Sequence, residues 1–252
     1  MTARPLLAVD GIAKRFRGLR AVDGVGFDVP QGGIVALIGP NGAGKTTVFN
    51  LIAGVYRPDA GRIFLDGADI TGLRPDQICK AGIARTFQIV RPFGGLSVLD
   101  NVVVGALRQT ADLAAARRAA LAILERLGLA AKAAQPAHAL TLPERKRLET
   151  ARALATRPKL LLLDEVMAGL RPVEIDGMVA VLTALCRETG LTILLTEHVM
   201  RAVMALSHKI VVLHHGQKIC EGPPAIVARD PQVLRSYLGS VGRHGGGVAV
   251  PC

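Results

Sequence analysis

Short runs of continuous hydrophobic residues alternate with helical segments along most of the chain. GGIVALIG (32–39), KLLLLDE (159–165) and LTILLTEH (191–198) each contain such a run. Runs of this length without polar alternation are typical of strands buried on both faces of a parallel sheet. Because helical segments lie between them, we predict an α/β fold with a parallel sheet covered on both sides.

Two other regions alternate hydrophobic and polar residues around glycines. They are LLAVDGIAKRF and RAVDGVGFDV near the start, and RIFLDGADI at residues 62–70. Alternation with a period of two is typical of strands with one exposed face. We therefore predict an antiparallel sheet beside the parallel one, so that the chain as a whole contains mixed strand directions.

Residues 97–135 are rich in alanine and leucine at helical spacing. Ser97 precedes the first predicted helix and Asp100 follows three residues later, which resembles a capping box. The stretch predicts a helical subdomain at about 91–155, inserted into an α/β core with its antiparallel sheet at about 1–90 and 156–238. The glycine-rich end, residues 241–252, predicts a flexible tail.

The segment GPNGAGKT (39–46) fits the phosphate-loop pattern G-x-x-x-x-G-K-[ST] and lies between a predicted strand and a predicted helix. Glycines let backbone N–H groups surround phosphate oxygens, and the helix directs the positive end of its dipole at them. Lys45 would place a charge between the outer phosphates, and the Thr46 hydroxyl would bind Mg²⁺. The loop residues expected to contact the nucleotide are Gly39, Asn41, Gly42, Ala43, Gly44, Lys45, Thr46 and Thr47.

Two adjacent carboxylates end the leucine-rich strand. Asp164 would complete the metal site, and Glu165 would polarise a water molecule for attack on the γ-phosphate. An ordinary strand end is the alternative, but the phosphate loop favours the catalytic interpretation. Together these residues predict a site that binds a nucleotide's phosphates with Mg²⁺ and can hydrolyse the γ-phosphate.

The net charge of +11 bears on the partners of the chain. A basic balance favours nucleotides, nucleic acid, an anionic membrane surface or an acidic subunit. Aromatic residues make up only 3% and tryptophan is absent, so a surface that stacks nucleic-acid bases has little to stack with. The basic residues do not form one block, which favours solvated basic faces.

Length and hydropathy restrict the class further. The 252 residues suffice for one large α/β domain, and no uncharged run approaches the ~20 residues of a transmembrane helix. The start, MTARPLLAVDG, lacks the features of a signal peptide, so we expect a cytosolic protein. Cys79, Cys186, Cys220 and Cys252 are far apart, which predicts free thiols rather than a metal site or disulfides.

Four motifs in order make the chain resemble the ATPase subunits of ABC transporters. They are GPNGAGKTT, TFQ (86–88), LLLLDE and TEH (196–198), with the helical insert between the second and the third. The resemblance covers about residues 6–239. GIARTFQIVRPFGGLSVLDNV and the ending DPQVLRSYLG are similar to one ATPase subunit of branched-chain amino acid importers, a group that also includes urea and short-amide importers. The fold implied is the P-loop NTPase fold of an ABC ATPase.

The resemblance implies an importer in which ATP binds between two ATPase subunits, identical or related. It implies two integral membrane permease subunits, a periplasmic solute-binding protein, a peripheral position on the cytoplasmic face of the inner membrane, and no nucleic-acid partner. Two alternatives stay open: a related exporter, for instance of lipopolysaccharide, and an ABC ATPase that acts on DNA or ribosomes. A GTPase is disfavoured because the chain has no NKxD-type base-recognition motif.

The resemblance also implies roles for single residues. Phe16 falls where an aromatic ring stacks on adenine, although a buried core position is the alternative. Gln88 falls on the loop that senses Mg²⁺ and the attacking water, and His198 on the switch that contacts the γ-phosphate. Residues 90–96 would lie near the membrane partner, with Phe93 either inserted there or packed internally.

The family's signature pentapeptide is altered here. In the family this glycine-rich segment contacts the γ-phosphate of the opposite subunit, and in this chain it reads LTLPE. Thr141 keeps the hydroxyl, Leu142 loses the close backbone approach of glycine, and Pro143 has no N–H. Thr141 and Glu144 can still form a capping box, with proline tolerated in the first turn, so we predict that the helix start survives.

The stretch AGLR (168–171) departs in the same region, because Arg171 replaces the Asp or Asn that the family usually has at the subunit seam. We favour a working site with weaker contacts across the seam. The alternative is a degenerate half-site, in which only the partner's signature drives hydrolysis.

Overall fold

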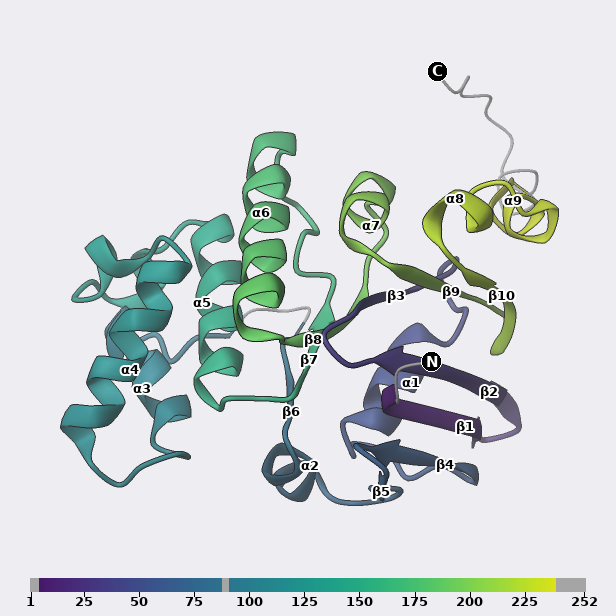
Figure 1. Ribbon diagram of the computed structural model, residues 1–252, viewed down its shortest axis with the longest axis horizontal. Coiled ribbons are helices and arrows are strands. Elements are labelled where there is room, and N and C mark those ends of the chain that lie inside the picture. The colour runs from purple at the N-terminus through teal and green to yellow at the C-terminus, as the bar shows by residue number, and fades with distance from the viewer. Residues whose placement is uncertain (1–4, 88–90, 239–252) are drawn as a thin grey trace.

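The computed structural model describes residues 5–87 and 91–238 and arranges them around two β-sheets (Figure 1). The larger sheet has the strand order β10-β9-β3-β8-β7-β6, and the smaller has the order β2-β1-β4-β5. The larger sheet contains β3 (Ile34–Ile38), β6 (Ile83–Arg85), β7 (Leu160–Asp164), β8 (Thr192–Thr196), β9 (Lys209–His214) and β10 (Gln217–Gly222). The smaller contains β1 (Pro5–Phe16), β2 (Leu19–Pro30), β4 (Ala60–Leu65) and β5 (Ala68–Asp69).

The strands predicted from continuous hydrophobic runs lie at the centre of the larger sheet. Every residue of β3, β7 and β8 is buried, and these strands run parallel to their neighbours. Only β10 is antiparallel to its neighbour, β9, among the described strands of this sheet. The prediction of a mixed, mainly parallel sheet is therefore confirmed. Strands β6, β9 and β10 were not assigned from the sequence: β6 has only three residues, whereas the run in β9 carried a usable signal.

The alternating segments form the antiparallel sheet that the sequence predicted. Strand β1 pairs antiparallel with both β2 and β4, and β4 pairs antiparallel with β5. The small sheet and helix α1 (Lys45–Ile52) cover one face of the larger sheet (Figure 1). Their buried side chains, among them Phe27 and Phe49, form one hydrophobic core with Val35 and Leu37 of β3.

Helices cover the other face of the larger sheet. Ile34, Ala36 and Ile38, which alternate with the residues just named, belong to a second core with helices of that face. Helices α6 and α7 lie above the sheet in Figure 1. The remaining helices are α2 (Pro75–Ala81), α3 (Val98–Ala106), α4 (Leu113–Arg126), α5 (Leu142–Ala155), α6 (Pro172–Thr189), α7 (Met200–Leu206), α8 (Pro224–Val227) and α9 (Pro231–Leu238).

Helices α3, α4 and α5 gather at one end of the molecule (Figure 1). The Ser97 hydroxyl accepts a hydrogen bond from the Asp100 N–H (3.0 Å), as the predicted cap requires. At the start of α5, Thr141 and Glu144 form the predicted capping box, in which the Glu144 carboxylate accepts from the Thr141 N–H at 2.9 Å. The boundaries assigned to the subdomain stay a prediction, and the expected tail at 241–252 lies outside the described residues.

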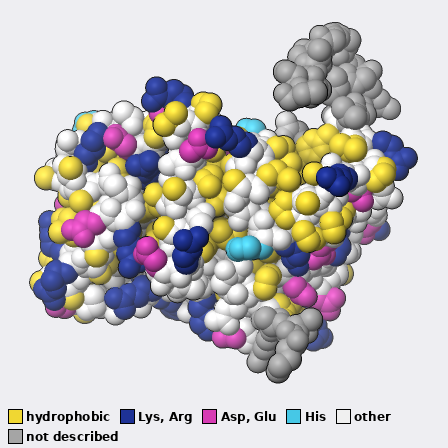
Figure 2. Space-filling model, turned by 45° about the horizontal axis from the view of Figure 1, so that its top comes forward, with side chains coloured by type: hydrophobic (Ala, Val, Ile, Leu, Met, Phe, Trp, Pro, Cys, Tyr) yellow, Lys and Arg dark blue, Asp and Glu magenta, His cyan; other side chains and the backbone are white. Residues whose placement is uncertain are grey.

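The surface agrees with the distribution of charge expected from the sequence. On the face drawn in Figure 2, Lys and Arg side chains are spread among acidic and hydrophobic ones rather than gathered in one block. None of the helices within 5–87 and 91–238 combines the length and hydropathy that a bilayer span requires. Cys79, Cys186 and Cys220 are free thiols, as predicted, and Cys252 lies outside the described residues.

Candidate nucleotide-binding site

The phosphate loop leaves β3 and enters α1, which begins at Lys45. Its glycines are required by close backbone packing. A Cβ at Gly39 would lie 2.2 Å from the carbonyl oxygen of Leu213, and a Cβ at Gly44, where φ is +102°, would lie 2.5 Å from that of Ala21. The loop therefore packs so closely against β9 and β2 that a side chain at Gly39 or Gly44 would clash with their backbone.

Lys45 bends back over the loop that carries it. Its Nζ donates to the carbonyl oxygens of Gly39 (2.7 Å) and Pro40 (3.1 Å), which orients the ammonium group toward the inside of the loop. Burial lowers the pKa of Lys45, while the carboxylates of Glu165 and Asp164 act in the opposite direction. An anion bound in the loop would replace the two carbonyl contacts with a charge-assisted one.

A cavity of about 600 Å³ lies over this loop and is also lined by residues of β1 and β2. Phe16 and Glu165 both line it, and Phe16 is 37% exposed, so the alternative of a buried core phenylalanine is wrong. Tyr56 packs edge-on against the Phe16 ring, with the ring centroids 5.1 Å apart. The other lining residues are Leu19, Arg20, Ala21, Asn41, Gly42, Ala43, Gly44, Lys45, Thr46, Thr47, His215 and Gly216.

The two carboxylates after β7 lie in different surroundings. Asp164 is buried, and its Oδ1 accepts from the Thr196 hydroxyl at 2.8 Å. Glu165 has a left-handed backbone (φ +49°), and its N–H donates to the Thr196 carbonyl at 3.0 Å. His198 Nδ1 lies 4.0 Å from Glu165 Oε2. The fold thus fixes the Asp164 carboxylate by hydrogen bonds and turns the Glu165 carboxylate toward the cavity and His198.

The oxygen donors present suit a magnesium ion. Thr46 lies in the first turn of α1 and offers a hydroxyl, and Asp164 offers a carboxylate held by its own hydrogen bonds. Among the described residues no group of three or more His, Cys, Asp or Glu side chains could hold a metal by itself. One hydroxyl and one carboxylate suit Mg²⁺, which is bound through one or two protein oxygens together with substrate phosphates and water rather than in an all-protein cage.

Comparison with known proteins identifies the family. The model of ABC transporter ATP-binding domains matches residues 22–168, more than half of the chain. This chain belongs to the ABC transporter ATPase family. A second model, described as a branched-chain amino acid ATP-binding cassette transporter, matches residues 217–242. The resemblance drawn from the four motifs is confirmed.

Relatives of this ABC ATPase extend over nearly its full length. The high-affinity branched-chain amino acid transport ATP-binding proteins BraF of Pseudomonas aeruginosa and LivG of Escherichia coli are each 40% identical, with 94% of this chain and 99% of the relative covered. Among solved structures, an ATP-binding cassette of an ABC transporter in its ADP conformation is 31% identical, with a TM-score of 0.86 and 94% and 100% coverage. The predicted fold is therefore confirmed, and the family is one of ATPases that bind nucleotide.

Sequence reasoning missed a buried charged cluster behind Glu165. Lys146 of α5 is only 3% exposed, and its Nζ donates to the Glu165 carbonyl oxygen at 3.1 Å. Glu197, 2% exposed, accepts from the Met167 N–H at 2.8 Å, and its other oxygen has no hydrogen-bond partner among the described residues. Burial raises the pKa of Glu197 to about 7, and the charge of Glu165 acts in the same direction. The usable signal was Lys146 itself, a charge on the buried face of a helix.

The altered signature lies on the surface at the start of α5. Leu142 is 47% exposed, and its Cδ2 would lie 3.3 Å from a Cβ at Gly169, so the altered signature lies beside the stretch AGLR that contains Arg171. Arg171 turns back onto Glu174, with Nη2 2.6 Å from the carboxylate. Thr141 does not line the cavity of its own chain.

The remaining predicted residues belong to the segment from Gln88 to Phe93, which is described only in part. Gln88 and Val90 lie outside the described residues. Phe93 is 47% exposed, and the Arg152 guanidinium carbon lies 4.8 Å from the centroid of its ring. The ring therefore packs against its own chain and is also accessible at the surface. Phe87, which precedes Gln88, is also exposed.

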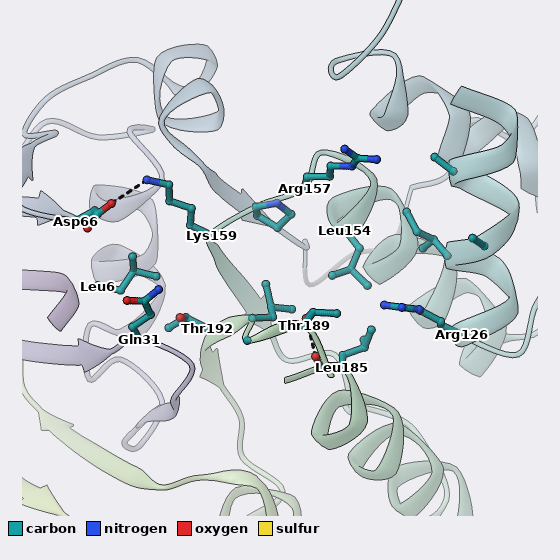
Figure 3. Close-up of a pocket in the computed structure, with 16 residues that line it drawn as sticks. Leu6, Gln31, Asp66, Arg126, Leu154, Arg157, Lys159, Leu185, Thr189 and Thr192 are labelled. Carbon is teal, nitrogen blue, oxygen red and sulfur yellow. Dashed lines mark hydrogen bonds and ion pairs between the residues drawn. The ribbon is translucent and has the colours of Figure 1, made fainter. Parts of the chain in front are cut away.

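A second cavity of about 600 Å³ opens at the other end of β7 and β8 (Figure 3). Arg126 of α4 points into it, and Lys159 points away from its centre toward Asp66, 2.9 Å distant. None of the phosphate-loop residues lines it. The cavity separates the base of the core sheet from α4 and is not part of the nucleotide site.

Proposed function

We propose that this chain is the ATP-binding and ATP-hydrolysing subunit of an importer for branched-chain amino acids or a related small polar solute. The observation that carries the proposal is the match of residues 217–242 to the branched-chain amino acid cassette model, at the end of a chain that is 40% identical to BraF and LivG. Those relatives are named for high-affinity branched-chain amino acid transport.

In the proposed mechanism, the loop from Gly39 to Thr47 holds the triphosphate of ATP, and Phe16 stacks on its adenine. Thr46, Asp164 and Gln88 would hold Mg²⁺, which would offset the negative charge of the phosphates when bound. Glu165 orients the attacking water, and His198, 4.0 Å away, reports the γ-phosphate.

The left-handed backbone of Glu165 supports this role for its side chain. A non-glycine residue at φ +49° is held there only when its surroundings fix it, and such residues concentrate at functional sites. Here the Thr196 carbonyl accepts from the Glu165 N–H and Lys146 donates to the Glu165 carbonyl oxygen. Both peptide groups of the residue are thereby fixed while its carboxylate faces the cavity.

The proposed assembly contains a second ATPase subunit, two permeases and, indirectly, a periplasmic binding protein, at the cytoplasmic face of the inner membrane. ATP at the seam would hold the two cassettes together, and hydrolysis would release them. Thr141 and the start of α5 would face the γ-phosphate of the partner subunit. The exposed Phe87 and Phe93 are the side chains that would meet a permease.

The test begins with a tagged chain purified from the detergent-solubilised membranes of the cells that make it. We expect two permease proteins to co-purify, and the complex in liposomes with a solute-binding protein to take up leucine when ATP is enclosed. Glu165→Gln should assemble equally well and give no uptake. Recovery of the chain with ribosomes or DNA instead, or with permeases that only expel solute, would overturn the proposal.

A further inference from the structure

Arg85 was not singled out by any motif, yet it connects three elements of the nucleotide site. It ends β6, the strand that leads into the Gln88 segment. Its Nη2 donates to Asp164 Oδ2 at 2.7 Å, and its Nη1 donates to Asn50 Oδ1 on α1, the helix that begins at the phosphate loop. One guanidinium therefore spans the loop helix, the metal carboxylate and the strand before Gln88.

The ion pair between Arg85 and Asp164 is buried. The side chains of Arg85 and Asp164 are 11% and 6% exposed. The guanidinium lies between two aromatic rings, 5.9 Å from the centroid of Phe49 and 5.6 Å from that of Phe87. Apolar rings lower the local dielectric constant and so strengthen the ion pair. The strengthened ion pair holds the Arg85 guanidinium in place.

Each carboxylate oxygen of Asp164 accepts one hydrogen bond from a described side chain. Oδ1 accepts from Thr196 and Oδ2 from Arg85, and each carboxylate oxygen has a second lone pair. Arg85 therefore fixes the orientation of the carboxylate without closing it to a metal-bound water. The Asp164 backbone N–H also donates to the Thr86 hydroxyl oxygen at 3.1 Å, which links the end of β7 to the residue after β6.

We propose that Arg85 is a positioning residue that serves as an internal counter-ion for Asp164, so that the site accepts the triphosphate before Mg²⁺ is bound. Without Arg85, the buried Asp164 carboxylate would keep more uncompensated negative charge and would repel the phosphates more strongly in the absence of Mg²⁺. Because Arg85 also donates to Asn50, it fixes the position of helix α1 relative to β7. The inference rests on the proposed role of Asp164 as a metal ligand.

The test compares nucleotide affinity with and without Mg²⁺, using a fluorescent ATP analogue in buffer that contains either Mg²⁺ or EDTA. In Arg85→Gln, the affinity in EDTA should fall about tenfold or more, and the affinity in Mg²⁺ by less than about threefold. Loss of packing alone would lower both by the same factor, so equal losses, or no loss in either buffer, would overturn the proposal.

Two further variants separate charge from geometry. Arg85→Lys keeps the charge but cannot span Asn50 and Asp164, so its affinity in EDTA should stay within about threefold of the wild type while its turnover falls about tenfold. Asn50→Ala should show the same pattern, because it cuts only the contact with α1. If Arg85→Gln does not fold, Arg85→Lys decides: a tenfold loss of affinity in EDTA there would contradict the counter-ion role.

The matched control is Arg74→Gln. Arg74 also makes two bonds to an aspartate, Asp76, but on the surface, with side chains 73% and 52% exposed. Its loss should leave both affinities unchanged. Failure of the wild-type chain to bind nucleotide at all would count against the proposed function, whereas equal losses in Arg85→Gln count against the counter-ion role alone.

Discussion

The phosphate loop and the signature face of this ABC ATPase are constrained in different ways. Around the loop, the backbones of neighbouring strands leave no space for a Cβ at Gly39 or Gly44. On the signature face, Leu142 is 47% exposed and Arg171 pairs with Glu174, three residues away. One half of the site is completed by its own chain, whereas the other half would be completed by a second subunit.

The contrast explains where the family pattern is kept and where it is lost. A phosphate loop that already packs against β9 and β2 cannot change without a cost to the fold. The start of α5 needs only a stable first turn, and the capping box of Thr141 and Glu144 supplies it with proline in place of glycine. Substitutions in the loop should therefore abolish function, and substitutions on the signature face should tune it.

The largest effect is expected from Glu165→Gln. Loss of the carboxylate should lower ATP turnover by about 10²–10⁴-fold, because the attacking water loses its base, while nucleotide binding persists. Phosphate release measures the turnover, and light scattering with and without ATP measures the mass. An ATP-dependent dimer would mean that LTLPE and AGLR can build a seam; a monomer would direct the experiment to a related partner ATPase. Unchanged turnover would contradict the role of Glu165.

Lys45→Ala should reduce ATP affinity about 100-fold or more, because the outer phosphates lose their only loop cation. The variant should remain folded, since the two hydrogen bonds that Lys45 donates go to carbonyl oxygens of its own loop, which water can reach in the alanine variant. Lys159→Ala, at the other cavity, is the control for loss of a lysine. Calorimetric titration gives the affinity, and retained affinity in Lys45→Ala would refute the phosphate-loop assignment.

The parts of the site that the sequence predicted are those encoded locally. The segment GPNGAGKT specifies its turn, its charge and its helix within eight residues, and LLLLDE specifies a buried strand with carboxylates at its end. The roles of Arg85 and Glu197 were not predicted, because they depend on contacts between strands that are distant in sequence. Arg85 and Asp164 are 79 residues apart, and only the register of β6 against β7 brings them together.

Glu197 provides a test of the charged cluster behind the seam. Its pKa is raised from 4.5 to about 7 in the folded chain, so the folded state holds an extra proton between these values. Stability should therefore fall as the pH rises through this window and level off above it. Compared with Glu197→Gln, the wild type should lose on the order of 1–2 kcal/mol of unfolding free energy between pH ~5.5 and pH ~8.

Urea unfolding at the two pH values measures this difference. Glutamine keeps an acceptor for the Met167 N–H, so the variant removes the titration and not the contact. Glu174→Gln is the control: its hydrogen bond with Arg171 lowers the pKa of Glu174, so the wild-type residue is ionised throughout this range. Parallel pH dependence in the wild type and Glu197→Gln would contradict the prediction.

The smallest effect is expected where the two halves of the site meet. Replacing both Leu142 and Pro143 by glycine restores close backbone approach and one N–H, so ATP-driven dimerisation of the Glu165→Gln chain should strengthen about three- to tenfold. The same change should lower the unfolding free energy by about 1–2 kcal/mol, because two glycines loosen the first turn of α5. If dimerisation strengthens while the unfolding free energy falls, LTLPE stabilises its own helix at the cost of weaker contacts across the seam. A dimer that weakens along with the fold would instead mean that Leu142 and Pro143 are themselves part of the contact.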